Sequence, residues 1–191
     1  MTPLSATPYV LLLTGTCGSG KSTISKLLAN RTGWARVSED EIWYEHFGKN
    51  RGLLGSDEYC HKRRYVHATI HDASRALLAG GKNVVIDATI HEAPPEAYKD
   101  LQEFWNAHGM AWKLRVLHPR LEIAISRDAL RPTGRLGADR VTTLRAKFTG
   151  TIFLPEWFVD TSEDTPDQTV TRLLDDPTAN VLHPGRHLRS E

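Results

Sequence analysis

Gly15-Thr-Cys-Gly-Ser-Gly-Lys-Ser22 is the most informative stretch of the chain, because it matches G-x-x-x-x-G-K-[ST] at every fixed position. This pattern is typical of a phosphate-binding loop, in which glycines let backbone N–H groups surround phosphate oxygens. Lys21 supplies a cation for the β- and γ-phosphates, and the Ser22 hydroxyl is suited to bind Mg²⁺. The motif therefore predicts ATP and Mg²⁺ as the cofactors.

The sequence on either side places this loop between a strand and a helix. Tyr9–Thr14 is a short apolar run, as expected of a strand buried on both faces of a parallel sheet. From Ser22 to Asn30 the apolar residues recur with helical spacing, and Gly33 lies where a C-terminal cap belongs. The N-terminus of this helix directs partial positive charge at the phosphates. We expect the nucleotide to contact the loop and the first helical turn: Gly15, Thr16, Cys17, Gly18, Ser19, Gly20, Lys21, Ser22 and Thr23.

Strand and helix patterns alternate along the rest of the chain. We predict further strands at 35–37, 83–87, 111–117 and 157–159, and helices at 42–47, 57–78, 94–108, 121–130, 139–149 and 165–174. Ser38 is expected to cap the 42–47 helix. This alternation favours a three-layer α/β/α fold of the P-loop NTPase type, with a parallel sheet of about five strands.

The length of 191 residues fits a single P-loop domain with a small inserted lid. We expect the core of the domain at about 9–175 and a polar C-terminal tail at 177–191. Within this core, at about 127–140, a proline and two glycines lie among arginines. This segment is predicted to be a small arginine-rich lid.

Composition restricts the partners. Hydrophobic residues make up 40% and charged residues 25%, which is ordinary for a globular protein. Lys and Arg total 24 against 23 Asp and Glu, so nucleic acid is an open but not a favoured partner. Two cysteines make no disulfide framework, and we find neither a basic leader nor a long apolar run. We expect a cytoplasmic protein without a membrane partner; its oligomeric state is not predicted.

Two aspartates follow predicted strands, at the sheet edge where α/β proteins bind ligands. Asp40 is our candidate for the catalytic base and a substrate contact, since transfer to a hydroxyl requires a group that accepts its proton. Asp87 is suited to act on Mg²⁺ through water or on the substrate. Alternatively, Asp40 only stabilises a helix dipole, and Asp87 caps the turn at Thr89.

Nearby carboxylates stay open as alternatives for these roles, namely Glu39, Glu41 and Glu92.

Four arginines recur in and around the predicted lid, at 127, 131, 135 and 140. Guanidinium groups suit phosphate oxygens and the charge that develops in the transition state. We expect Arg127 and Arg131 to act in catalysis with Lys21, and Arg140 to contact the substrate. A solvated basic face is the alternative for each of them, and it is favoured for the run His61–Arg64. No histidines or cysteines have zinc spacing, so no metal other than Mg²⁺ is expected.

From about Val10 to Leu174 the chain resembles a group of small P-loop kinases and phosphotransferases. The group includes chloramphenicol phosphotransferase, gluconate kinase, zeta-toxin-type kinases and the kinase domain of phage-type polynucleotide kinase. The matching parts are the loop, Ser38-Glu-Asp40, Val85-Ile-Asp-Ala-Thr89, and the arginines at 127 and 131. The resemblance implies that the residue at 40 is the base, that the one at 87 contacts the acceptor, and that these arginines lie over the phosphates.

Two further segments are similar to chloramphenicol phosphotransferase. Leu136–Arg140 resembles its Gly-Asp-Arg run, although Ala138 interrupts the match, and Val159–Ser162 resembles a second segment. Loops that follow the last strand border the adenine in such folds, which makes Asp160–Ser162 a nucleotide-site candidate.

These observations together predict an ATP-dependent kinase, a phosphotransferase with an alcohol group as acceptor. The acceptor is expected to be a hydroxyl of a small molecule or of a nucleoside- or nucleotide-like compound. Two alternatives stay open: a 5′-hydroxyl polynucleotide kinase, and a nucleotide-dependent switch with slow ATP hydrolysis.

Overall fold

The computed structural model describes residues 7–49, 51–53, 55–90, 105, 107–149 and 153–176. In this part of the chain a five-stranded sheet has the order β2-β3-β1-β4-β5, and every neighbouring pair is parallel. The strands are β1 (Tyr9–Gly15), β2 (Ala35–Ser38), β3 (Val84–Asp87), β4 (Ala111–Leu117) and β5 (Phe158–Val159). The predicted parallel sheet of about five strands is confirmed.

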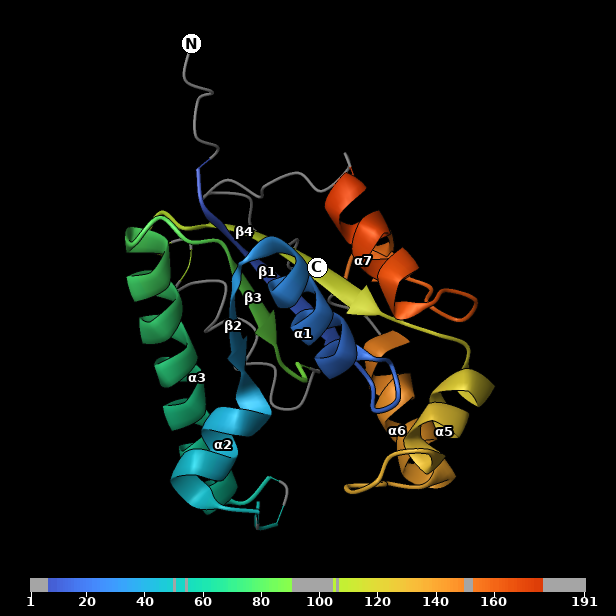
Figure 1. Ribbon diagram of the computed structural model, residues 1–191. Helices are drawn as coiled ribbons and strands as arrows, with labels where there is room; N and C mark the ends of the chain where they lie inside the picture. The colour runs from blue at the N-terminus through green and yellow to red at the C-terminus, as the bar shows by residue number, and fades with distance from the viewer. Residues whose placement is uncertain are drawn as a thin grey trace.

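Helices cover the sheet and extend beyond its carboxyl edge. They are α1 (Lys21–Thr32), α2 (Glu39–Phe47), α3 (Asp57–Ala79), α5 (Leu121–Ala129), α6 (Ala138–Thr149) and α7 (Pro166–Asp175), with a 3₁₀ turn η1 at Pro155–Trp157. Figure 1 shows α2 on one side, and α5 and α6 on the other side, of the edge at which the strands end. None of the helices in the described ranges is both long and apolar enough to cross a bilayer.

The three layers follow from the alternation of side chains along β1. Val10 and Leu12 belong to a core cluster that includes residues of α3. Leu11 and Leu13 point to the opposite face, in a cluster that includes residues of α1 and α7. Successive residues of a strand face opposite sides, so an unbroken apolar run is buried on both faces.

Two predicted elements differ in the structure. The 42–47 helix begins at Glu39, and Ser38 occupies the N-cap position without a side-chain cap hydrogen bond, so the expected capping is wrong. Three acidic residues in the first turn stabilise that helix end instead. Trp157 belongs to η1 rather than to the last strand, because Pro155 opens a 3₁₀ turn in which Trp157 N–H donates to the Leu154 carbonyl at 2.9 Å. The 94–108 helix, except for 105 and 107–108, and the tail at 177–191 lie outside the described residues.

The strand order determines which residues meet at the carboxyl edge. β3 lies between β1 and β2, and its last residue, Asp87, pairs in register with Leu13 on one side and Ser38 on the other. The phosphate loop follows β1, and α2 follows β2. Asp87 therefore lies between the loop and the first turn of α2.

Candidate functional site

A pocket of about 650 Å³ opens at the carboxyl edge of the sheet. Its walls come from the phosphate loop and α1, from α2 and the segment after it, from the end of β3, and from α5 to α7. This is the place where open α/β sheets bind their ligands. The pocket is the candidate active site.

The phosphate loop packs tightly against its neighbours and contains glycines in conformations that favour this residue. Gly18 and Gly20 have φ values of 74° and 94°, which side chains other than glycine rarely adopt. Thr16 Oγ1 and Ser19 Oγ are buried without a hydrogen-bond partner among the described residues. No side chain caps the N-terminus of α1. Unpaired hydroxyls and an uncapped helix N-terminus fit a bound phosphate.

Lys21 folds back across this loop. Its Nζ donates hydrogen bonds to the carbonyl oxygens of Gly15 at 2.7 Å and Thr16 at 3.1 Å. The ammonium group thus lies at the concave side of the loop, within the pocket wall.

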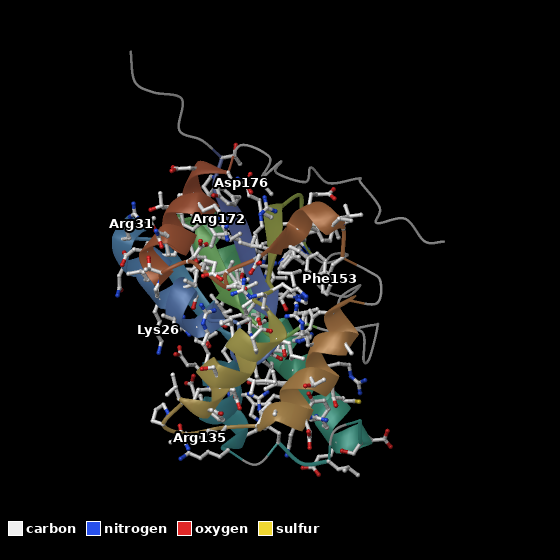
Figure 2. The ribbon with its side chains drawn as sticks, turned by 90° about the vertical axis from the view of Figure 1, so that its right-hand side faces the viewer. Lys26, Arg31, Arg135, Phe153, Arg172 and Asp176 are labelled. Carbon is white, nitrogen blue, oxygen red and sulfur yellow. The ribbon has the colours of Figure 1, made fainter. Side chains whose placement is uncertain are left out.

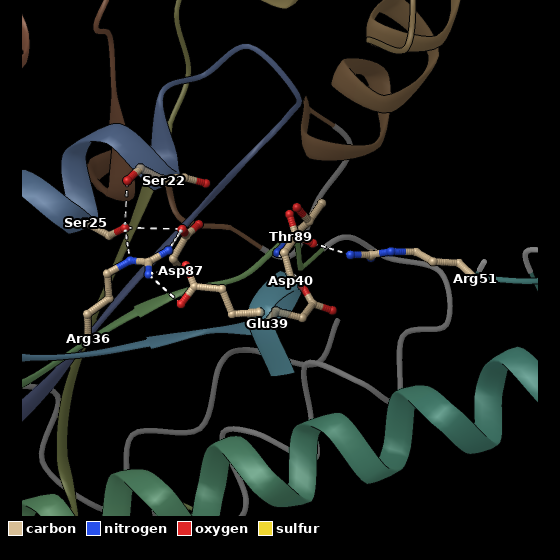
Figure 3. Close-up of polar contacts among 9 residues, drawn as sticks. Ser22, Ser25, Arg36, Glu39, Asp40, Arg51, Asp87 and Thr89 are labelled. Atoms are coloured by element: carbon tan, nitrogen blue, oxygen red, sulfur yellow. Dashed lines mark hydrogen bonds and ion pairs between the residues drawn. The ribbon is translucent and has the colours of Figure 1, made fainter. Parts of the chain in front are cut away.

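Ser22 and Asp87 bring oxygen atoms together below the loop. Asp87 Oδ2 accepts hydrogen bonds from Ser25 Oγ at 3.2 Å and from Arg36 Nη2 at 3.0 Å (Figure 3). Asp87 Oδ1 accepts none from the residues that the structure describes. A hydroxyl and a carboxylate oxygen with an unused lone pair are donors that suit Mg²⁺, which takes few protein ligands and keeps water and phosphate oxygens. Among the described residues no group of three or more acidic, histidine or cysteine side chains forms another metal site.

Asp40 lies in the first turn of α2 and lines the same pocket. Its half-exposed carboxylate forms an ion pair with Arg51 (Figure 3). The Arg51 guanidinium lies 4.9 Å from the centroid of the Trp43 ring and 5.8 Å from that of Tyr44. Burial lowers the pKa of Arg51, but the carboxylates of Asp40 and Glu39 outweigh it, so the pKa lies above its ordinary value. Arg51 therefore stays charged beside the candidate base.

Glu39 is buried and ties α2 to the segment after β3. Its Oε2 accepts a hydrogen bond from Thr89 N–H at 2.7 Å, and its Oε1 lies 3.8 Å from His67 Nε2. Burial alone would raise the pKa of Glu39, but His67, Arg63 and the Thr89 amide outweigh it and lower the pKa to about 2. Glu39 is thus a buried carboxylate held ionised, in the same helical turn as Asp40.

Three of the four arginines reach the pocket. Arg127 and Arg131, at the end of α5 and just after it, and Arg140 on α6 line its wall. Arg127 Nη2 donates to the Thr161 carbonyl at 2.8 Å, and Arg131 Nη1 lies 3.6 Å from Asp128 Oδ1. Arg135 does not line the pocket; Figure 2 shows it at the periphery of the molecule.

The segment between α5 and α6 is anchored at its C-terminal end. Buried Asp128 accepts hydrogen bonds through Oδ2 from the amides of Leu136 at 2.9 Å and Gly137 at 3.1 Å. These contacts place the arginine-bearing segment against the pocket. Its movement as a lid stays a prediction.

The other candidates are distributed differently. Of Asp160–Ser162, only Thr161 lines the pocket. Asp160 Oδ1 accepts a hydrogen bond from Ser162 N–H at 2.9 Å, and its contacts with Ser162 lower the pKa of Asp160. In the run His61–Arg64, the expected solvated face does not hold for Arg63, which is buried and donates to the Thr89 carbonyl at 3.1 Å. Two other carboxylates were alternatives to Asp40 and Asp87. Glu41 forms an ion pair with Arg36, and Glu92 lies outside the described residues.

Residues 10–150 match a protein-family model described as an AAA domain. The chain belongs to this family. The probable gluconokinase of Rattus norvegicus is 33% identical to this AAA domain over 97 residues, which are 50% of this chain and 49% of the relative. The chain therefore spans about half the length of the curated relative that it matches.

Solved structures share the fold of this AAA domain. A sugar kinase from a Janibacter species has a TM-score of 0.66 at 19% identity, over 91% of this chain and 96% of the other. A chain of an RNA repair complex has a TM-score of 0.60 at 23% identity, over 78% of this chain and 46% of the other. These matches confirm the three-layer P-loop fold.

The structure brings the predicted site residues into one place. Gly15 does not line the pocket, but its carbonyl oxygen accepts a hydrogen bond from Lys21. All the others line it: Thr16, Cys17, Gly18, Ser19, Gly20, Lys21, Ser22, Thr23, Asp40, Asp87, Arg127, Arg131 and Arg140. Their individual roles stay predictions. Sequence reasoning missed Arg36, Arg51 and the buried role of Arg63. Arg51 lies in a glycine-rich segment without periodicity, and the partners of Arg36 come from three different elements.

Proposed function

We propose that this AAA domain is an ATP-dependent kinase that transfers the γ-phosphate of ATP to a hydroxyl group of a small molecule. The observation that carries the proposal is that the phosphate loop, Asp40 and three arginines line a single pocket. A kinase needs all three parts within reach of one phosphoryl group. The names of its relatives, a probable gluconokinase and a sugar kinase, support the same reaction class.

The phosphate loop would hold the donor. Its backbone amides and the hydroxyls of Thr16 and Ser19 surround the phosphates, and Lys21 exchanges its contacts with Gly15 and Thr16 for phosphate oxygens. Ser22 and Asp87 would hold Mg²⁺. When bound, Mg²⁺ supplies positive charge to the β- and γ-phosphate oxygens.

Asp40 would accept the proton of the acceptor hydroxyl. As the acceptor oxygen forms a bond to the γ-phosphorus, the bond from that phosphorus to the β,γ-bridging oxygen breaks. The proton moves to the Asp40 carboxylate, the bridging oxygen keeps the electron pair, and ADP leaves. Arg127, Arg131 and Arg140 would offset the negative charge that spreads over the transferring group. Closure of the segment at about 127–140 would exclude water.

A 5′-hydroxyl polynucleotide kinase is the second candidate, because a chain with this fold occurs in an RNA repair complex. The net charge of +1 provides no general attraction to a polyanion, which favours the small-molecule acceptor. Binding of a 5′-hydroxyl oligonucleotide that weakens steeply with salt would favour the polynucleotide instead.

The test is ADP production from ATP·Mg²⁺ with a panel of acceptors: sugars and sugar acids, nucleosides, phenicol and aminoglycoside antibiotics, and 5′-hydroxyl oligonucleotides. Asp40→Asn is expected to lower acceptor-dependent turnover by about 100-fold or more without weakening ADP binding. Glu45→Gln makes the same charge change on an exposed part of α2 and serves as the control. Slow turnover that is indifferent to every acceptor and to Asp40 would instead identify a nucleotide-dependent switch.

A further inference from the structure

Arg36 joins three elements around the candidate metal site. It is a β2 residue whose side chain is only 13% exposed. Its Nε donates to Ser25 Oγ on α1 at 2.9 Å, and its Nη2 donates to Asp87 Oδ2 at the end of β3 at 3.0 Å. Its Nη1 lies 2.8 Å from each carboxylate oxygen of Glu41 on α2. Figure 3 shows this guanidinium beside the Asp87 carboxylate, on the side of Ser25.

These contacts determine which oxygen of Asp87 is available. Oδ2 receives hydrogen bonds from both Arg36 and Ser25, whereas Oδ1 accepts none from the described part of the chain. Ser25 Oγ also lies 3.2 Å from the carbonyl oxygen of Ser22. The network therefore connects the two candidate metal ligands, Ser22 and Asp87, through Ser25, on the side of the phosphate loop.

The charges of the cluster are arranged to keep Asp87 attractive to a cation. Arg36 carries one positive charge, and Asp87 and Glu41 carry one negative charge each. Glu41 occupies Nη1 with both of its oxygens, so the guanidinium is shared between two carboxylates instead of offsetting Asp87 alone. The cluster keeps a net negative charge next to the place where a divalent cation would bind.

We propose that Arg36 is a positioning residue for the Mg²⁺ site. It fixes the carboxylate of Asp87 through Oδ2 and leaves Oδ1 for the water shell of Mg²⁺, while Glu41 limits how far Arg36 offsets the charge of Asp87. This assigns Asp87 to the metal rather than to the acceptor. The inference rests on the proposed function in that it takes Asp87 to serve a nucleotide bound with Mg²⁺. Arg36 is not among the residues that line the pocket, so its effect on the metal site passes through Asp87.

The test is the affinity for a fluorescent ADP analogue, measured once with EDTA and once with saturating Mg²⁺. Their ratio is the Mg²⁺ enhancement. Arg36→Met is expected to lower this enhancement by about 10-fold to 100-fold, the usual cost of losing a residue that orients a metal ligand, while the affinity in EDTA changes little. Arg36→Lys is expected to be intermediate, because an ammonium group reaches Asp87 but lacks the planar fork. Arg75→Met, which removes an exposed arginine paired with Asp72, is the control.

Mn²⁺ in place of Mg²⁺ gives a second measurement, because bound Mn²⁺ is visible by electron paramagnetic resonance. The wild-type complex with ADP is expected to show the spectrum of protein-bound Mn²⁺, and the Arg36→Met complex the spectrum of Mn²⁺ held by ADP alone. An Arg36→Met protein with the wild-type Mg²⁺ enhancement would overturn the proposal. Equal losses of affinity in EDTA and in Mg²⁺ would also overturn it, since they indicate a structural role only.

Glu41→Gln keeps the proposal testable if Arg36→Met does not fold, because Glu41 is exposed. Without the charge of Glu41, the positive charge of Arg36 acts on Asp87 alone and weakens the attraction of Asp87 for Mg²⁺. The Mg²⁺ enhancement is therefore expected to fall in this variant as well. An unchanged enhancement in Glu41→Gln would count against the inference. A wild-type protein that shows Mg²⁺-enhanced ADP binding but transfers phosphate to no acceptor would contradict the proposed function and leave the role of Arg36 intact.

Discussion

Gly18 of the phosphate loop packs against Ala124 of α5 so closely that a Cβ at position 18 would lie 2.0 Å from the Ala124 carbonyl oxygen. The loop is therefore seated on the helix that carries Arg127. Gly18 also has a φ of 74°, which strains any other residue. The glycine at this position serves the packing of the site as well as the turn of the loop.

Gly18→Ala is expected to displace the loop from α5 and to weaken ADP binding by at least about 10-fold, with a loss of stability of more than about 1 kcal/mol. Gly81→Ala is the control, because Gly81 has a φ of 77° but no atom within 4 Å of an added Cβ. That variant suffers only the backbone strain. Calorimetric ADP titration and thermal unfolding of both variants check the prediction, and equal ADP affinities in the two would contradict it.

The ion pair between Arg51 and Asp40 gives a second prediction. Arg51 stacks on Trp43 and fixes the candidate base from a segment that contains Gly48 and Gly52. Arg51→Met is expected to lower kcat with the acceptor by roughly 10-fold to 100-fold, because a small displacement of a reacting group is costly. ADP affinity is expected to stay unchanged.

Lys49→Met is the matched control for Arg51, since it removes an exposed positive charge from the same segment. Steady-state kinetics separates kcat from the KM of the acceptor. A fall in ADP affinity as large as the fall in kcat would show that Arg51 supports the whole pocket rather than Asp40.

Glu39 is expected to make the stability of the protein sensitive to acid. Its pKa in the folded state, about 2, lies below its ordinary value of 4.5. The unfolded chain therefore binds more protons between these pH values, so the stabilisation is complete above pH 4.5 and is lost as the pH falls towards 2. Glu39→Gln is expected to lower the free energy of unfolding at pH 7 by at most roughly 3 kcal/mol.

Urea unfolding of wild type and Glu39→Gln at pH 7 and pH 3 measures this difference, with Glu45→Gln as the exposed control. The difference in the free energy of unfolding between wild type and Glu39→Gln should be smaller at pH 3 than at pH 7. A difference of the same size at both pH values would mean that the charge of Glu39 contributes nothing to stability.

The contrast between Asp87 and Arg36 shows how far sequence reasoning reaches in this fold. Asp87 could be predicted because a strand end in a parallel sheet is a local pattern that leads to a known edge. Arg36 lies in a short strand, and nothing in the four-residue sequence Ala35–Ser38 distinguishes it from a polar residue that faces solvent. Its partners are 5, 11 and 51 residues away, on different elements. Only the strand order β2-β3-β1 brings them together.

Arg51 was missed for a related reason. It lies in a glycine-rich segment where no periodicity specifies the direction of a side chain, and it is held by one carboxylate and by aromatic rings of α2. The phosphate loop could be predicted almost completely, because its backbone and side-chain requirements lie within eight consecutive residues.

Cys17 lies inside the phosphate loop, lines the pocket and is partly exposed. An alkylating thiol reagent is therefore expected to inactivate the protein, and ADP or ATP to protect it. If the nucleotide covers the thiol fully, a ligand concentration of 100 Kd slows labelling by about 100-fold, because only the free protein reacts. Cys17→Ser is expected to resist inactivation, whereas Cys60→Ser should be inactivated like wild type, since Cys60 lies in the first turn of α3 and packs against the core, away from the phosphate loop. Mass spectrometry identifies the labelled residue while activity is followed. Full activity after complete labelling of Cys17 would contradict a close contact between this part of the loop and the phosphates.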